Sequence, residues 1–500
     1  MSTTAGTARH VGGLSWDFTR WTFRHWFGLA FGLAVVPALW VILERPDLAV
    51  LVAVVWWVVP GLVCTVWARF WPFSWHRLVA GPLQRWGWRK WARDNWADIA
   101  RQCDLSTSYE VSVRNWWNGT TSQQTRWKSP RLRKVSTSDY VMDLAVDARR
   151  GQTSRDITAQ AEAIGAAANA VSATGRKQSP SRAVISVVMV DNLTGEVASP
   201  EPVPGKHGAV VVGRYASGLP VAWDPLRCLS MAIQGMTRSG KSALCYGYLG
   251  AVAHRPDVIV CGIDKTGVLL TPFANGRGAS WTVTSAKDGP KVAAVLDSIV
   301  DFTNDRIEGF LARGKDKLNT FDAATPVVLV VLEEYPGLIK QLRKQDSAEG
   351  RAVKDRVAPK VEAAVGIIAA EGAKAGVVTM VLAQRMSSES IDTDTRANLP
   401  IRATLRVDKL DAVRMLHDKA ETEQVEDVLE ASAGRVLYQA PNVPLQQFQA
   451  SSTDYETYTA RVARGLKEVP VAGAFRTPPV EVPQPAEPSG KGKSKSGAPS

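Results

Sequence analysis

The sequence feature that most constrains this chain is the stretch GMTRSGKS at residues 235–242. It fits the pattern GxxxxGK[ST], in which glycines allow the backbone to curl until its N–H groups face a phosphate. An apolar segment, 228–234, precedes the loop, and a helix-capable segment, 243–253, follows it. This order predicts a strand, a phosphate-binding loop and a helix whose N-terminus faces the phosphates.

Every residue of this loop is a candidate ligand of ATP. Lys241 is expected to reach the β- and γ-phosphates, and the Ser242 hydroxyl is expected to bind Mg²⁺. A chance match in an ordinary loop is the alternative, and the flanking strand and helix disfavour it. The candidate residues are Gly235, Met236, Thr237, Arg238, Ser239, Gly240, Lys241 and Ser242.

A pair of glutamates follows a second apolar strand, Val327–Leu332. ATP hydrolysis needs one carboxylate on the side of the metal and one group that orients the attacking water. We therefore expect Glu333 to act with Ser242 at Mg²⁺ and Glu334 to polarise the water. Two exposed glutamates at the end of a strand are the alternative interpretation.

Polar residues also follow two further apolar strands. Gln384 comes directly after Val377–Ala383, and Asp264 ends the segment VIVCGID, followed by Lys265. Because ligands of open α/β sheets bind at the carboxyl ends of the strands, Gln384 is a candidate γ-phosphate sensor. A simple strand-terminating polar residue is nearly as good an explanation for Gln384, and Asp264 and Lys265 could be structural.

Two uncharged apolar runs, 26–43 and 48–68, stand near the N-terminus. Each is long enough to cross a hydrocarbon core of about 30 Å as a helix. The connection between them is only four residues long, so they predict an antiparallel transmembrane hairpin. Arginines flank the pair on both sides, and the positive-inside rule therefore places both termini in the cytoplasm. Two buried helices of a soluble protein, or a cleaved signal peptide, are the alternatives.

The segment after this hairpin is rich in tryptophan and arginine. Of the 18 tryptophans of the chain, 16 lie between Trp16 and Trp127. Over residues 71–96 they alternate with arginines, which favours helices in the lipid headgroup region. Base stacking on nucleic acid is the alternative. Residues 97–129 receive no assignment.

Composition gives only broad limits. The net charge of +12 favours a polyanionic partner, either nucleic acid or anionic lipid. The five cysteines are widely spaced and form no CxxC pair, so they predict reduced core residues without a disulfide framework or a zinc site.

The chain is expected to contain six segments. Within the fourth, a strand at 140–146, a helix at 154–172 and a strand at 183–190 predict a small α/β unit. The last segment is rich in proline, lysine and serine, which favours disorder. The segments are a cytoplasmic N-terminal segment (1–25), the transmembrane hairpin (26–68), a basic juxtamembrane region (69–129), a small α/β linker domain (130–205), a P-loop ATPase domain (206–465) and a disordered basic tail (466–500).

Together these motifs resemble the motor domain of the FtsK/SpoIIIE branch of the HerA-FtsK ATPases, over roughly residues 130–450. The similarity includes GRxxxGxP at 213–220, the phosphate-binding loop, the acidic pair followed by Tyr335, AQR at 383–385, ANLPIR at 397–402 and GRVLY at 434–438. Arg238 in the loop and Glu333 in the acidic pair depart from the usual pattern of that family, which has glycine and aspartate there. A winged-helix module after the motor is also not evident.

The resemblance implies a RecA-like P-loop fold, ATP and Mg²⁺ as cofactors, and a ring of identical subunits, expected to be a hexamer. It further implies an arginine finger that reaches the ATP of the neighbouring subunit, with Arg402 as the first candidate and Arg414 as the second. The plan of two spans and one motor is similar to the transfer proteins of actinobacterial conjugative plasmids and integrative elements.

The sequence therefore favours a motor in the bacterial cell membrane that uses ATP to translocate double-stranded DNA. Two alternatives stay open. One is a type VII secretion-like ATPase that moves protein, although only one phosphate-binding loop occurs here. The other is a ring subunit that binds nucleotide but has lost hydrolysis because its acidic pair is altered.

Overall fold

The computed structural model describes residues 49–114, 117, 121–203, 208–387, 389, 391–469 and 474–482. The chain divides into a first unit, 1–91, and a second unit, 92–500.

The apolar run 26–43 lies outside the described residues, and the run 48–68 falls largely on helix α2, Ala49–Phe70. Within the part of the chain that the structure describes, no helix combines the length and the apolar character needed to span a bilayer. After α2 come α3 (Pro72–Trp75), the π-helical turn η2 (His76–Ala80) and α4 (Gly81–Gln102).

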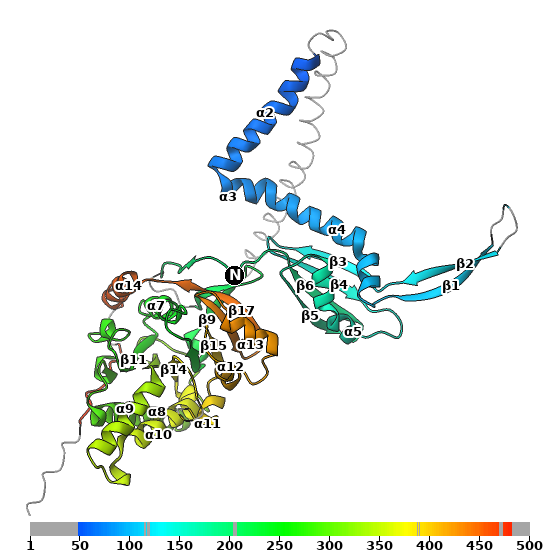
Figure 1. Cartoon of the computed structure of the whole chain (residues 1–500). Helices are drawn as coiled ribbons and strands as arrows, with labels where there is room; N and C mark the ends of the chain where they lie inside the picture. Colours follow the sequence, from blue (N-terminus) through cyan, green and yellow to red (C-terminus); the bar gives the residue numbers. More distant parts are fainter. Residues whose placement is uncertain are drawn as a thin grey trace, which may run out of the picture. The chain divides into compact units, whose positions relative to one another are not determined.

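A long two-stranded ribbon occupies much of the segment that the sequence left unassigned. Strands β1 (Thr107–Arg114) and β2 (Thr121–Lys128) pair antiparallel along their whole length, and Figure 1 shows them in cyan. The base of the ribbon is fixed by the Trp96 indole, which donates a hydrogen bond of 2.7 Å to the Pro130 carbonyl. All eight residues of β2 are exposed.

A small domain follows, built on a four-stranded antiparallel sheet with the order β3-β4-β6-β5. Every second residue of β4, namely Met142, Leu144 and Val146, is buried. These side chains lie on one face of the sheet, where helices α5 and α6 also bury Ile157 and Ile164. The elements are β3 (Arg131–Thr137), β4 (Val141–Asp147), α5 (Ser154–Ala159), α6 (Ala161–Ala167), β5 (Ser172–Ser179) and β6 (Arg182–Val188).

The predicted helix 154–172 is wrong in its extent. It is two short helices that end at Ala167, and Asn169 then adopts the left-handed conformation with φ 53°. Two strands, β3 and β5, were not predicted, because their largely exposed residues carry little of the apolar alternation that marks a half-buried strand.

The large domain contains a mixed sheet of order β12-β11-β13-β14-β10-β15-β16-β17-β8-β9, with β7 beside β17. The strands from β12 to β15 run parallel, and β15, β16, β17, β8 and β9 pair antiparallel in turn. The strands are β7 (Val197–Ala198), β8 (Val210–Tyr215), β9 (Pro220–Trp223), β10 (Met231–Gln234), β11 (Val258–Asp264), β12 (Thr282–Val283), β13 (Val327–Glu333), β14 (Val377–Ala383), β15 (Ile401–Thr404), β16 (Arg435–Ala440) and β17 (Val443–Ser452).

Helices cover both faces of the parallel part, which explains the continuous aliphatic runs of β11, β13 and β14. Side chains of α8, α9 and α10 form one buried cluster with Val328, Val330 and Leu332, and side chains of α7 and α14 form a second cluster with Leu329 and Val331. The helices are α7 (Lys241–Val252), α8 (Gly289–Leu311), α9 (Tyr335–Ala348), α10 (Val357–Ala375), α11 (Thr393–Ala397), α12 (Leu410–Leu416), α13 (Thr422–Leu429) and α14 (Tyr455–Glu468). The α/β fold class is confirmed.

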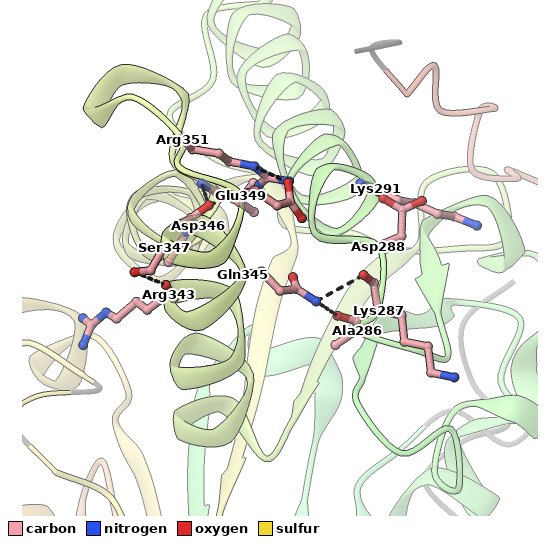
Figure 2. Close-up of polar contacts among 12 residues, drawn as sticks. Ala286, Lys287, Asp288, Lys291, Arg343, Gln345, Asp346, Ser347, Glu349 and Arg351 are labelled. Carbon is pink, nitrogen blue, oxygen red and sulfur yellow. Dashed lines mark hydrogen bonds and ion pairs between the residues drawn. The ribbon is translucent and has the colours of Figure 1, made fainter.

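A buried carboxylate joins α9 to α10. Asp346 is 3% exposed and accepts hydrogen bonds from the backbone N–H groups of Val357 and Ala358, in the first turn of α10. Arg351 pairs with Asp346 at 3.1 Å (Figure 2). On the same helix, the amides of Gln341 and Gln345 both donate to the carbonyl of Ala286, before α8. These contacts fix the C-terminal part of α9 against α10 and the segment before α8.

The large domain begins earlier than residue 206. Strand β7 pairs with Ser451 and Ser452 at the end of β17, and Glu201 forms an ion pair of 2.7 Å with Arg461 of α14. The predicted boundary at 205 is therefore too late. By contrast, the hairpin expected from GRxxxGxP is present as β8 and β9, with Gly218 at φ 79° in its turn.

The predicted disorder of 466–500 is wrong for residues 466–469 and 474–482. Helix α14 continues to Glu468. The ring centroid of Phe475 then lies 5.0 Å from that of Phe302 and 6.3 Å from that of Trp281. The Arg306 guanidinium lies over both phenylalanine rings. The backbone of Phe475 and Thr477 donates to the carbonyls of Ala323 and Arg277. Composition alone does not reveal these aromatic partners.

We expect Phe475→Ala to release this C-terminal segment, because it removes the aromatic contacts that hold it. The loss is about 2 kcal/mol for a partly buried ring. Amide hydrogen exchange of residues 474–482 is then roughly 30-fold faster, as that energy implies. Val482→Ala is the matched control, since Val482 is exposed, and equal exchange in both variants would refute the role of the ring.

Candidate nucleotide-binding site

The parallel strands bring the predicted site residues to one edge of the sheet. Strand β10 lies between β14 and β15, with Gln234 opposite Ala383 on one side and Thr404 on the other. Strand β13 lies beyond β14 and ends beside β11, with Glu333 opposite Asp264. The loop 235–240, Glu333, Glu334 and Gln384 therefore all follow carboxyl ends of parallel strands, as the sequence predicts.

Glycine is required at two positions of the phosphate-binding loop. Gly240 has φ 96°, and a Cβ there would lie 2.7 Å from the Gly434 nitrogen. A Cβ on Gly235 would lie 2.6 Å from the Ser239 hydroxyl oxygen. Arg238 also adopts the left-handed conformation, with φ 64°. That conformation costs a side chain roughly 1 kcal/mol, which explains physically why glycine suits this position better than arginine.

Backbone hydrogen bonds hold the loop between neighbouring strands. The N–H of Gly235 donates to Ala383, that of Met236 donates to Arg406, and that of Gly434 donates to Ser239. Ser239 is buried, while Met236, Thr237, Arg238 and Ser242 are exposed. The loop is thus fixed at its base by β14, by the segment after β15 and by the turn before β16, and its outer residues remain accessible to a ligand.

Glu334 is held between the loop and the predicted sensor strand. Its carboxylate lies 3.5 Å from the Lys241 ammonium and accepts a hydrogen bond of 3.1 Å from the backbone N–H of Gln384. Glu334 has φ 46°, a left-handed conformation that is strained for a glutamate. The structure therefore brings Lys241, Glu334 and Gln384 together, and the contact of Gln384 to Glu334 is made by its main chain.

Glu333 is the more buried carboxyl group of the pair. One of its oxygens, Oε2, is buried and has no hydrogen-bond partner among the described residues. Burial, and next the Asp264 carboxylate, raise the pKa of Glu333 to about 7, although Lys241 opposes the shift. A buried oxygen without a partner fits a Mg²⁺ ion or its bound water, and a cation would favour the ionised form. Glu333 is therefore suited to hold Mg²⁺ or its bound water.

Asp264 is structural. It is fully buried, and its carboxylate accepts backbone hydrogen bonds from Thr266, Gly267, Leu269 and Leu270. These bonds shape the turn after β11 and leave the carboxylate well satisfied.

The two candidate finger arginines differ in their surroundings. Arg402 is partly buried at the start of β15 and donates hydrogen bonds to the carbonyls of Leu399, Leu416 and Arg396 in its own chain. Burial lowers the pKa of Arg402. Arg414 is exposed on α12, and no ion pair joins it to a described residue.

A buried polar chain beneath the loop was not predicted. The Gln234 amide donates to the Thr404 hydroxyl and to the Ala412 carbonyl. Thr404 then contacts a ring nitrogen of His417 at 2.9 Å, and the other ring nitrogen contacts Gln439 at 3.2 Å. Burial lowers the pKa of His417 to about 4. The four residues come from separate strands and a loop. In the sequence, the only sign of them is that two apolar strands, β10 and β15, end in the polar residues Gln234 and Thr404.

No protein-family profile matches the sequence, and no curated protein sequence matches it. Solved structures, however, are similar to this chain. The pCW3 conjugation coupling protein TcpA, a monomer form with ATPγS, is 17% identical with a TM-score of 0.44, over 67% of this chain and 93% of that one.

Two type VII secretion ATPases are also similar. EssC of Geobacillus thermodenitrificans (ATPases 2 and 3) is 15% identical with a TM-score of 0.44, over 56% of this chain and 52% of that one. The cytoplasmic domain of Thermomonospora curvata EccC is 22% identical with a TM-score of 0.39, over 58% of this chain and 34% of that one. The chain thus spans about half and about a third of their lengths.

Glu334→Gln is expected to stop hydrolysis without stopping nucleotide binding, because the amide retains the size of the side chain but polarises water poorly. The rate falls by roughly 100-fold to 10,000-fold. Phosphate release and the Kd of a fluorescent ATP analogue measure the two effects. The control is Glu308→Gln, at an exposed site on α8. Wild-type turnover in Glu334→Gln would exclude Glu334 as the water-polarising residue.

His417 should make the stability of the chain depend on pH. The native state holds His417 neutral, with its pKa lowered to about 4, so its contribution is complete above the unfolded pKa of about 6.5 and is lost as pH falls toward 4. Between pH 7.5 and pH 5 the free energy of unfolding falls by about 2 kcal/mol.

His417→Asn is expected to be less stable at pH 7.5 but to show a flatter dependence, measured by urea unfolding at both pH values. Equal slopes in the two proteins would show that another group is responsible.

Proposed function

We propose that this chain is a membrane-anchored, ring-forming ATPase that translocates double-stranded DNA. The observation that carries the ATPase part is the joint placement of Lys241, Glu333 and Glu334 at one sheet edge, with Glu334 in contact with Lys241. Lys241 and the loop N–H groups bind the phosphates, Ser242 and Glu333 hold Mg²⁺, and Glu334 orients the attacking water. Mg²⁺ supplies charge neutralisation between the phosphates when it is bound.

DNA as the cargo is supported by charge. The chain carries a net charge of +12, and a ring that encloses a duplex needs only sequence-independent contacts to its phosphates. Conjugative transfer between bacterial cells is the process that we propose for this motor. Protein cargo, as in type VII secretion, is the alternative that the test below must separate from it.

Membrane anchoring is supported by the two apolar runs and by the surface of the first unit. Many large apolar side chains between residues 58 and 86 are exposed: Val58, Val59, Leu62, Val63, Val66, Phe70, Trp71, Phe73, Leu78, Leu83 and Trp86. Exposed apolar area on this scale is costly in water and favours lipid. We propose that the N-terminal hairpin spans the cell membrane and leaves both termini in the cytoplasm.

Ring assembly, in our proposal, completes the active site. Arg402 is bound to three carbonyls of its own chain, and moving it to a neighbour would leave those contacts unmade. Exposed Arg414 is free of this cost, and we propose it as the arginine that reaches the ATP of the adjacent subunit. The hexamer expected from the resemblance is part of this proposal.

The proposal is tested by triplex displacement on the detergent-solubilised full chain. Wild type should remove a third strand from duplex DNA when ATP is present, and duplex should stimulate its ATPase. Lys241→Ala should do neither. ATP turnover without displacement, together with export of a small protein, would favour secretion. Binding of ATP with no turnover would favour a ring subunit that does not hydrolyse.

Arg414→Ala should reduce turnover by roughly 1,000-fold or more while the Kd for nucleotide is unchanged, as for other arginines that act between subunits. Mixing Arg414→Ala with Lys241→Ala subunits should restore part of the activity, because some mixed interfaces then contain both residues. Lys419→Ala, at an exposed site nearby, is the control. A mixture as inactive as its components would argue against a residue acting across the interface.

A further inference from the structure

The proposed ATPase site leaves the β1–β2 ribbon unexplained. An isolated two-stranded ribbon is only marginally stable in water, yet here all of β2 is exposed. Its base is well anchored, since Trp96 and Leu105 are buried, the Trp96 indole bonds to Pro130, and Ser106 contacts Ser129 at 2.8 Å. A ribbon that is fixed at its base and leaves all of β2 exposed is suited to contact a partner.

The charged residues of this ribbon and of the segment after it are mostly basic. No acidic residue occurs between Glu110 and Asp139, whereas basic residues are concentrated from Arg126 to Lys134. We call this set the basic track: Arg126, Lys128, Arg131, Arg133 and Lys134, all exposed. Of these, Arg133 lies 3.6 Å from Asp147, and no ion pair joins the other four to a described residue. The chain from Arg126 to Lys134 reaches at most about 26 Å if fully extended, a length over which duplex DNA presents many phosphates.

The remaining side chains of the ribbon fit nucleic acid better than lipid. Strand β2 reads TSQQTRWK, so hydroxyl and amide groups line both of its faces, and such groups commonly contact phosphates and bases. Insertion into a membrane requires an apolar face, which β2 does not have. A two-stranded ribbon also has the width to enter the major groove of B-form DNA. Tyr109 and Trp127 add exposed rings beside the basic side chains.

From this geometry we infer that the ribbon and its basic track form a docking surface for the backbone of double-stranded DNA, outside the ATPase site. This inference rests on the proposed function, since it names a surface that would bind the double-stranded DNA that the motor is proposed to move. Contacts are to phosphates, so binding is independent of sequence. Glu110 is the one acidic residue of the ribbon strands, and it limits the attraction.

The test measures binding of a labelled random-sequence duplex to the full chain in detergent, by fluorescence anisotropy over a range of salt concentrations. The variant is Arg126→Gln/Lys128→Gln/Arg131→Gln. Its affinity should fall on the order of tenfold or more, and the slope of log Kd against log salt should fall by about 2.7, since each lost phosphate contact removes about 0.9. Glu110→Gln should strengthen binding. ATP turnover without DNA should be unchanged in all of them.

The control is Arg313→Gln/Lys315→Gln/Lys317→Gln, which removes three exposed basic residues outside the ribbon. An equal loss of DNA affinity in this control would show that net charge alone causes the effect, and it would overturn the inference. If wild type binds no duplex, the proposed function fails. If wild type binds duplex and the ribbon variant binds equally well, only the ribbon inference fails.

Photo-crosslinking separates DNA from lipid. A photoreactive residue in place of Gln124, which is exposed in the middle of β2, should form adducts with duplex DNA when the full chain is held in nanodiscs of anionic lipid. Adducts with lipid alone would overturn the inference and make the ribbon a membrane-contacting element.

Discussion

The contact between Lys241 and Glu334 is the interaction on which the candidate site depends. It joins the helix after the phosphate-binding loop to the end of β13, across the intervening strand β14. Gln384 completes the contact by donating its backbone N–H to the same carboxylate. A γ-phosphate would compete with Glu334 for the Lys241 ammonium, so nucleotide binding should free the carboxylate to meet water. The strained backbone of Glu334, at φ 46°, is consistent with a residue positioned for function.

The neighbouring Glu333 lies at the same sheet edge as Glu334 but in different surroundings. It lies deeper, with an oxygen that no described residue satisfies and a pKa raised to about 7. Asp264, on the adjacent strand, contributes to this rise, and its own carboxylate is satisfied by backbone N–H groups. The Lys241 ammonium is close enough to Glu333 to oppose the rise of its pKa.

The sequence predicts the buried strands well and the exposed elements poorly, for a physical reason. The segments 258–264 and 377–383 are strands with those bounds because both faces of a parallel sheet are covered, which selects largely apolar runs. The ribbon has no core side, so TSQQTRWK carries no strand signal. Phe475 sits in a proline-rich segment, and its order comes from Phe302, Trp281 and Arg306, which are distant in sequence. For Arg402, the sequence shows the charge but not the three carbonyls that bind it.

Gln234 explains how the loop could be linked to the helix that carries Arg414. Its amide nitrogen donates to the Ala412 carbonyl, on α12, and its carbonyl oxygen accepts from the Met386 backbone, two residues after Gln384. One buried side chain therefore connects the strand before the phosphates, the segment after the sensor strand and the candidate finger helix. Because Gln234 has no exposed surface and each amide atom is paired, a shift of the loop must move a neighbour or break a buried hydrogen bond, at a cost of about 1–3 kcal/mol. In the proposed ring, these contacts would link the phosphate-binding loop of one subunit to the helix that carries Arg414.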